Sequence, residues 1–146
     1  GVNNIGPEGG AALAEGLKGN TTLRSLDITR NNIGSKGASA VAAILKETQI
    51  TTLRLGGNGI GGYYNDENEF VATPEGMIAL CEGLTGSAVT SLDLRWNEIG
   101  DEGASALAAV LKETQITDLD IAKNGIGAEG ASALAAILDE TQITKL

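Results

Sequence analysis

Apolar and polar residues alternate in a short pattern that recurs along the chain. In residues 91–100, SLDLRWNEIG, Leu92 and Leu94 flank Asp93, as in a short strand with one buried face. The pattern ends in Asn-x-Ile-Gly and recurs at 26–34, 53–61 and 119–127, and a partial copy, NNIG, occupies residues 3–6. It predicts three-residue strands at Ser25–Asp27, Thr52–Arg54, Ser91–Asp93 and Asp118–Asp120.

A stretch with helical periodicity follows each turn. In residues 103–111, one face holds two leucines with small residues beside them: Gly103, Ala104, Leu107, Ala108 and Leu111. The glycine at the start of this face lets a helix approach the strand layer closely. The pattern predicts helices over residues 9–17, 37–45, 76–84, 103–111 and 130–138.

The turn asparagines give the period of the repeat. Asn3, Asn31, Asn58, Asn97 and Asn124 are separated by 28, 27, 39 and 27 residues. A fixed period of this size indicates a solenoid, in which each unit buries its apolar face against its neighbours. The spacing of 39 is one period plus an insertion of twelve residues, which we place at 62–73.

Strand, turn and helix in this order require parallel strands joined by right-handed crossovers. Strands lie about 4.8 Å apart, whereas packed helices need about 8–10 Å, so the stack has to curve. The expected fold is α/β, a right-handed curved solenoid or horseshoe with parallel strands on its concave side and helices on its convex side.

The full pattern, L-x-x-L-x-L-x-x-N-x-I-G-x-x-G-A-x-x-L-A-x-x-L, is seen with valine first in residues 89–111. It resembles the ribonuclease-inhibitor-like subtype of leucine-rich repeats over nearly the whole chain except residues 62–73. The resemblance implies a single solenoid over residues 1–146, with about five repeats of 27–28 residues, that acts by binding protein. The family includes inhibitors that wrap enzymes, sensor regions of innate-immune receptors and GTPase-activating proteins.

Outward strand positions form the first candidate binding surface. Asp27, Arg54 and Asp93 alternate in charge across neighbouring strands, and such pairs order a sheet surface. Asp120 then lies beside Asp93 without a cation between them, and Asp118 is close by. We therefore expect an acidic end of the concave face, with Arg95, Lys123 and Lys145 at its margins. A docking surface for a basic patch and a merely solvated sheet face are the two interpretations.

Aromatic residues mark the second candidate surface. The insertion carries Tyr63, Tyr64 and Phe70, and the remaining aromatic residue, Trp96, lies just before the next turn asparagine. We expect all four at one rim of the horseshoe. Exposed rings at an edge are typical binding anchors, and the alternative is that these rings pack on one another to hold the loop. The turn asparagines, by contrast, are expected to be structural: Asn31, Asn58, Asn97 and Asn124 should satisfy buried backbone groups.

Composition limits the chemistry. The net charge of −9 argues against nucleic acid or an anionic membrane as the main partner and is compatible with a basic protein surface. The chain has no His, and its single cysteine, Cys81, falls on the apolar helix face, so we expect no catalytic residue, metal or cofactor. Residues 66–69, DENE, lack the Gly and distal Glu of a calcium loop. One cysteine also favours an intracellular, cytoplasmic location.

These observations favour a protein-interaction scaffold or recognition domain that uses the concave face and the aromatic insertion. The alternatives are a structural subunit of a larger complex and a GTPase-activating module that projects Arg30 or Arg95. The chain starts within a repeat and stops where a strand would begin. Because a solenoid needs polar caps, we expect a segment of a longer protein, with ends covered by further repeats or by partners.

Overall fold

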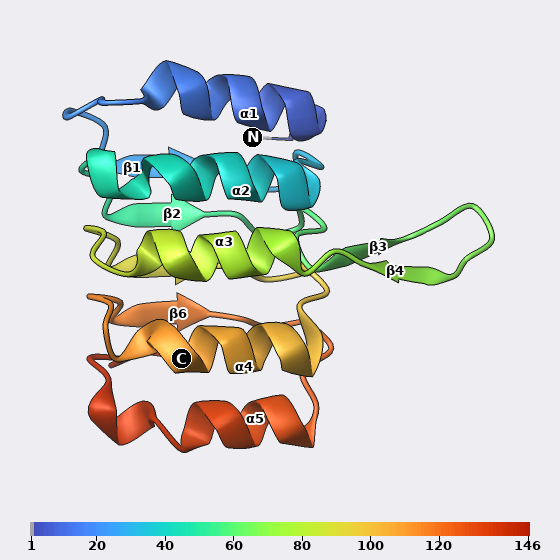
Figure 1. Ribbon diagram of the computed structural model, residues 1–146, viewed down its shortest axis with the longest axis vertical. Coiled ribbons are helices and arrows are strands. Elements are labelled where there is room, and N and C mark those ends of the chain that lie inside the picture. Colours follow the sequence, from blue (N-terminus) through green and yellow to red (C-terminus); the bar gives the residue numbers. More distant parts are fainter. Residues whose placement is uncertain (1) are drawn as a thin grey trace.

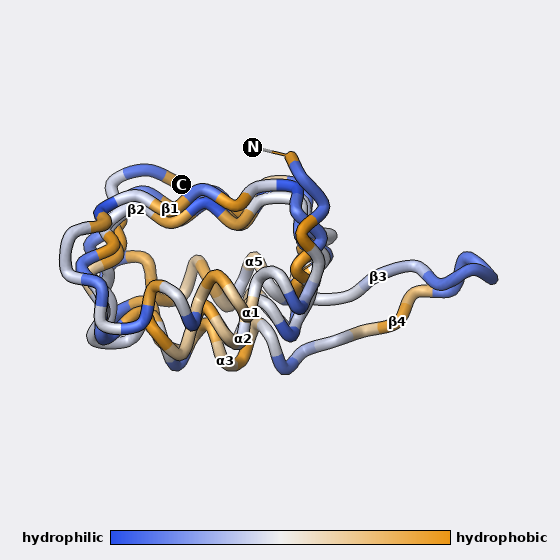
Figure 2. Tube along the Cα trace, turned by 90° about the horizontal axis from the view of Figure 1, so that it is seen from above, coloured by the Kyte–Doolittle hydropathy of each residue, from blue (hydrophilic) through white to orange (hydrophobic). Residues whose placement is uncertain are grey.

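The computed structural model describes residues 2–146 as two stacked layers (Figure 1). One layer is a parallel sheet in the order β1-β2-β5-β6, formed by Ser25–Asp27, Thr52–Arg54, Ser91–Asp93 and Asp118–Asp120. The other layer holds five helices: α1 (Gly6–Leu17), α2 (Gly34–Ile44), α3 (Glu75–Leu84), α4 (Gly100–Leu111) and α5 (Ala128–Ala135). Figure 2 shows the strands on one side and the helices on the other. The predicted strands and solenoid are confirmed.

The helix boundaries differ from the prediction at both ends. α1, α2 and α4 begin three residues earlier, at Gly6, Gly34 and Gly100, each with a left-handed φ of about +60 to +70°. Because glycine adopts this φ without strain, the helix begins directly after Asn-x-Ile. The first helical turn is exposed, so it carries no apolar periodicity from which it could be predicted. At the other end, α2 and α5 stop before the predicted leucine and continue as short 3₁₀ turns, Leu45–Glu47 and Leu138–Glu140.

The core lies between the two layers and repeats with the chain. In the first three strand-containing repeats, two leucines or isoleucines of each strand segment and the Ile of the following turn are buried, as Leu53, Leu55 and Ile60 show. In the last repeat, Ile121 and Ile126 are half-buried against the core. The predicted apolar face of α4 is buried along its whole length. Each repeat therefore contributes one thin layer, and adjacent layers cover one another.

A ladder of asparagine side chains joins the repeats at the carboxyl ends of the strands. The Asn97 amide is fully buried and donates to the carbonyls of Leu94 in its own repeat and Leu55 in the preceding one, at 2.9 and 3.0 Å. Its oxygen accepts the N–H groups of Asn58 and Ile60, at 2.9 and 3.4 Å. Asn58 and Asn124 make the same set of bonds with their neighbours.

Threonines form a second ladder at the amino ends of the strands. The hydroxyl and N–H of Thr90 both donate to the carbonyl of Thr51, and Thr117 donates in the same way to Thr90. A further Ser or Thr hydroxyl donates to a carbonyl at the helix end in the four repeats after the first, as Thr114 does to the carbonyl of Leu111 at 2.7 Å. The link of sequence KETQI, at residues 46–50 and 112–116, thus ends one helix and leads into the next strand at a fixed position.

The insertion forms a β-hairpin that projects from the solenoid beyond the carboxyl ends of the strands (Figure 1). Its strands, β3 (Gly62–Tyr64) and β4 (Phe70–Ala72), pair antiparallel, and the N–H of Thr73 donates to the carbonyl of Gly61 at its base. Without residues 62–73 the chain would read Gly61-Pro74-Glu75-Gly76, which is the GPEG of residues 6–9 that opens α1. The hairpin therefore interrupts an otherwise regular repeat.

Asn97→Ala should destabilise the fold by about 3 kcal/mol or more, because it leaves several buried N–H and carbonyl groups without partners. The matched control is Asn3→Ala, since Asn3 holds the same repeat position but is exposed. Chemical denaturation followed by circular dichroism measures the free energy of unfolding of both variants. Equal decreases would contradict a stabilising role of the buried asparagine ladder.

Deletion of residues 62–73 should change the free energy of unfolding by less than about 1 kcal/mol, because it removes a projecting hairpin and restores the 27-residue period. Removal of residues 105–116, also twelve in number but inside a regular repeat, should abolish cooperative unfolding. A loss of the cooperative transition in the first deletion would show that the hairpin is needed for the fold.

Candidate functional site

The register of the sheet confirms the predicted column of charged side chains. Asp27 pairs with Arg54, Arg54 with Asp93, and Asp93 with Asp120 on adjacent strands. We define the concave face as these residues and the outward residues beside them: Thr29, Arg30, Arg95, Trp96, Asp118, Lys123 and Lys145.

Each aspartate of this column has a local structural task. The Oδ1 atoms of Asp27, Asp93 and Asp120 accept the N–H of the residue two positions later, at 3.0, 3.0 and 3.1 Å. The bond from Thr29 is the main reason that the pKa of Asp27 lies below its ordinary value. These carboxylates therefore close the ends of β1, β5 and β6, which explains why Asp follows the first leucine in three of the repeats.

Arg95 changes the expected acidic end of the concave face. Its guanidinium donates to both carboxylate oxygens of Asp93, at 3.0 and 2.8 Å, and its Nε lies 3.3 Å from Asp120 Oδ2. The hydrogen bonds to Asp93 raise the pKa of Arg95. Arg95 was expected at the margin, but its guanidinium covers both carboxylates and compensates one of their two negative charges. The side chain of Asp93 is only 12% exposed beneath it.

The remaining carboxylates of the concave face also have cationic neighbours. Arg54 Nη1 lies 3.8 Å from Asp27 Oδ2, and Lys145 Nζ lies 3.0 Å from Asp118 Oδ2. The concave face so defined carries four carboxylates and five cationic groups, the latter being Arg30, Arg54, Arg95, Lys123 and Lys145. The prediction of an acidic patch here is wrong, because side chains from the strand ends fold back over the column.

Trp96 is the exposed aromatic residue of the concave face. Its backbone is left-handed, with φ of 57°, and 55% of the residue is exposed. Lys123 Nζ lies 5.8 Å from its ring centroid, within the range of a cation–π contact. The ring borders a hollow of about 320 Å³ that Arg30, Arg95 and Thr29 also line.

The other aromatic residues lie on the hairpin. The rings of Tyr64 and Phe70 are cross-strand partners with centroids 5.4 Å apart, and Tyr63 and Tyr64 are both more than half exposed. The Phe70 ring lies against Gly62, where an added Cβ would overlap it. The four aromatic residues therefore form two sets, because Trp96 pairs with Lys123 while Tyr64 and Phe70 pair with each other. All four follow the carboxyl ends of the strands, at the expected rim, but within this rim they are divided between the concave face and the hairpin.

The tip of the hairpin is polar and acidic. Asn65 Oδ1 accepts the N–H groups of Glu67 and Glu69, at 3.0 and 2.8 Å, and Asn68 adopts a left-handed φ of 59°. Asp66, Glu67 and Glu69 are exposed around this turn. The tip presents carboxylates to solvent while the rings lie nearer the base.

Other groups of chemical interest are accounted for by the fold. Cys81 is buried, and burial raises the pKa of its thiol to about 11. In the described residues, no three His, Cys, Asp or Glu side chains are grouped to hold a metal ion. Across residues 2–146, none of the helices has the length and apolar character that a membrane crossing requires.

Two residues that were expected on the concave face, Arg30 and Lys123, lie around Trp96, a grouping that was not predicted from the sequence. Arg30 and Lys123 occupy the position of Trp96 in other repeats, directly before the turn asparagine, and both share its left-handed backbone. Aligning the repeats on their asparagines could have placed Arg30 in the hollow and Lys123 against the ring. The asparagines themselves are buried in the ladder and are no part of a binding surface.

Arg95→Gln should lower the thermal unfolding midpoint more than Arg54→Gln does. The first change leaves the nearly buried Asp93 carboxylate without a cation, whereas the second breaks an exposed pair at 3.8 Å. Differential scanning calorimetry at low and high salt compares the two variants. Equal shifts would mean that Arg95 contributes no more than a surface ion pair.

Comparisons with known proteins agree with this repeat structure. A family model described as "Leucine Rich repeat" matches residues 19–42, 88–108 and 114–135. Leucine-rich repeat-containing protein 45 of Gallus gallus is 33% identical over 102 residues, which make up 68% of this chain and 14% of that protein. The chain thus spans a small part of the length of this relative.

A solved structure titled "Leiomodin-1 Actin-Binding Site 2 (ABS2)" is similar in fold. The TM-score is 0.73, and the match covers 94% of this chain and 75% of that chain. At 17% sequence identity the likeness concerns the fold alone. With the asparagine ladder, the parallel sheet and the matched repeats in view, the chain belongs to the leucine-rich repeat proteins, in their ribonuclease-inhibitor-like subtype.

Proposed function

We propose that this domain recognises a protein partner through Trp96 on the concave face and through the projecting hairpin. Leucine-rich repeat domains commonly bind protein and are typically non-catalytic. The observation that carries the proposal is an exposed tryptophan at a backbone position that disfavours it.

Trp96 has no evident role in stabilising the solenoid. The residue before each of the four buried turn asparagines is left-handed, and the equivalent position in the preceding repeat is Gly57, with φ of 70°. A large side chain costs on the order of 1 kcal/mol in this conformation, where glycine is strain-free. Trp96 accepts this strain while remaining more than half exposed. Tryptophan is enriched among the residues that dominate binding energy at protein interfaces.

The hairpin supports the same conclusion. It interrupts a repeat that the flanking sequence would complete, and it places Tyr63, Tyr64 and Phe70 in solvent at about half exposure or more. A set of exposed rings on a projecting element is a typical contact surface.

Charge assigns different tasks to the two surfaces. On the concave face Asp93 and Arg95 hold each other in place, so they shape the surface around Trp96, while Arg54, Asp118 and Asp120 keep exposed polar atoms for a partner. A basic partner surface suits the carboxylates of the hairpin tip better than the charge-balanced concave face. Arg95 does not suit the GTPase-activating alternative, because its guanidinium is held on two carboxylates and does not project. No observation favours a purely structural subunit.

Photo-crosslinking in native extracts tests the proposal. A photoreactive amino acid in place of Trp96 or Tyr63 should crosslink the same partner protein, identified by mass spectrometry. The same group in place of Ala109, an exposed residue of the convex side, should not. A partner crosslinked from Ala109 alone would place the interface on the helices and overturn the proposal.

Trp96→Asn separates binding from stability, because Asn tolerates a left-handed backbone. We expect an unfolding midpoint at or above that of the wild type and a loss of partner capture of about tenfold or more. Lys46→Asn, an exposed change outside both surfaces, is the control and should capture the partner normally. Undiminished capture by Trp96→Asn would remove Trp96 from the interface.

A further inference from the structure

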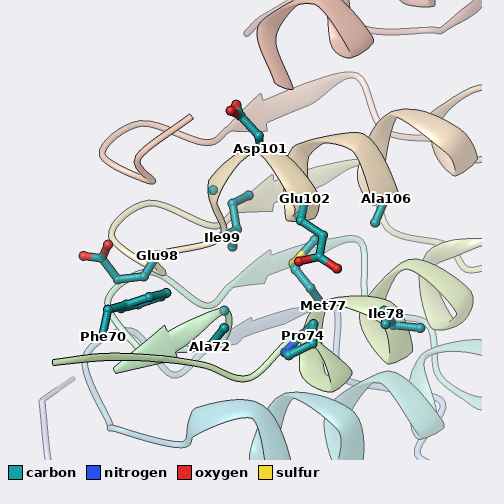
Figure 3. A pocket seen from close by; sticks show the side chains of 13 residues that line it. Phe70, Ala72, Pro74, Met77, Ile78, Glu98, Ile99, Asp101, Glu102 and Ala106 are labelled. Carbon is teal, nitrogen blue, oxygen red and sulfur yellow. The ribbon is translucent and has the colours of Figure 1, made fainter. Parts of the chain in front are cut away.

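An open apolar groove lies at the base of the hairpin, between α3 and α4. Figure 3 shows the side chains that line it, and its volume is about 320 Å³. Phe70, Ala72 and Pro74 form one wall, Met77 and Ile78 the next, and Ile99, Gly103 and Ala106 of the following repeat complete it. This groove is separate from the hollow beside Trp96, with which it shares no lining residue.

The hairpin itself creates the groove. α2 and α4 begin three residues before the first glycine of their apolar face, Gly37 and Gly103, whereas α3 begins one residue before Gly76. The inserted hairpin separates Gly61 from Pro74 and Glu75, so the first turn of α3 is incomplete where the chain leaves the stack. Phe70 and Ile78 border the opening, and each remains about half exposed.

The rim of the groove is acidic. Glu98 lies beside Phe70 at one end, and the carboxylate of Glu102 extends over the floor near Met77 (Figure 3). In the described chain no ion pair joins Glu98 or Glu102 to a cation, and no lining residue is Lys or Arg. Asp66, Glu67 and Glu69 lie at the far end of the same hairpin and do not line the groove.

A third rim carboxylate is already engaged. Asp101 points away from the groove toward α5, where its Oδ1 accepts the N–H groups of Gly127 and Gly130 at 2.7 and 2.8 Å. It joins the last two repeats and is not available to a ligand. The groove therefore offers an apolar floor with two available carboxylates.

We infer that this groove docks a short segment of a partner protein in which large apolar side chains are flanked by Lys or Arg. The volume is at the lower end for a ligand pocket and suits one or two side chains. The apolar floor takes the anchor, while Glu98 and Glu102 pair with the flanking cations and disfavour acidic segments. The inference rests on the proposed protein-binding function, but it uses a different surface from Trp96.

Three labelled peptides test the inference on the full chain: GSKRLLKRSG, its acid-flanked form GSEELLEESG, and its anchor-free form GSKRAAKRSG. Fluorescence anisotropy measures affinity, and two-dimensional NMR locates the binding. We expect saturable shifts of the amides of Ile78, Gly103 and Ala106 with the first peptide, and binding weaker by about tenfold or more with the other two. No saturable shift up to about 1 mM, or equal affinity for basic and acidic flanks, overturns the inference.

Two variants with matched controls complete the test. Ala106→Phe fills the groove, and its control is Ala40→Phe at the same helix position in α2, which is also half-buried. The double variant Glu98→Gln and Glu102→Gln removes the negative charge of the rim. Its control is the double variant Glu47→Gln and Glu113→Gln, which removes two exposed carboxylates in the links after α2 and α4. Each groove variant should weaken the basic peptide about tenfold or more, and each control less than about twofold. If Ala106→Phe fails to fold, the variant with Glu98→Gln and Glu102→Gln still tests the inference.

Different results would contradict the proposed interface at Trp96 and the proposed docking in the groove. Trp96→Asn should leave peptide affinity unchanged, and a loss there, or shifts confined to the concave face, would overturn docking in the groove while leaving the role of Trp96 intact. Peptide binding in the groove together with crosslinking only from Ala109 would support the groove and reject the concave interface. Binding of the anchor-free peptide as tightly as the first would show charge attraction alone and also reject the groove.

Discussion

The hydrogen-bond ladder of the turn asparagines is the constraint on which the rest of the structure depends. Each side-chain amide donates to carbonyls of two successive repeats and accepts N–H groups of the preceding one, as Asn97 does with Asn58 and Leu55. No repeat can shift without breaking bonds that are out of reach of water. The buried groups thus hold the repeats in register, and the thin apolar layers can stack only in that register.

The ladder also dictates the backbone around it. The residues on both sides of Asn31 and Asn97 are left-handed, and the N–H of Gly61 donates to the carbonyl of Asn97. An insertion is tolerated only where these bonds are complete, and the hairpin begins at Gly62, directly after them. The same constraint identifies Trp96 as unusual, because its position suits Gly or Asn better.

The sequence predicts the parts of the fold that repeat. Leu92 and Leu94 show the alternation of a strand, and the spacing of the asparagines gives the repeat period. All four strands of the parallel sheet were therefore predicted correctly. Helix starts were missed because the first turn of α4 is polar and carries no periodic signal. The hairpin was missed because its strands, GYY and FVA, show no alternation of apolar and polar residues and occur only once, whereas the equally short strands of the sheet recur in every repeat. The position of Arg95 depends on its side-chain conformation, which no sequence pattern specifies.

Differences between repeats are therefore more informative about function than the repeat itself. The concave charges compensate one another through Arg95, Arg54 and Lys145, so they offer little net attraction to a charged partner. The apolar contacts left for binding lie at Trp96, on the hairpin and in the groove beside it, while unpaired carboxylates gather at the hairpin and the groove rim. Affinity should accordingly come from buried rings and apolar anchors, and the acidic groups should select which segments approach them.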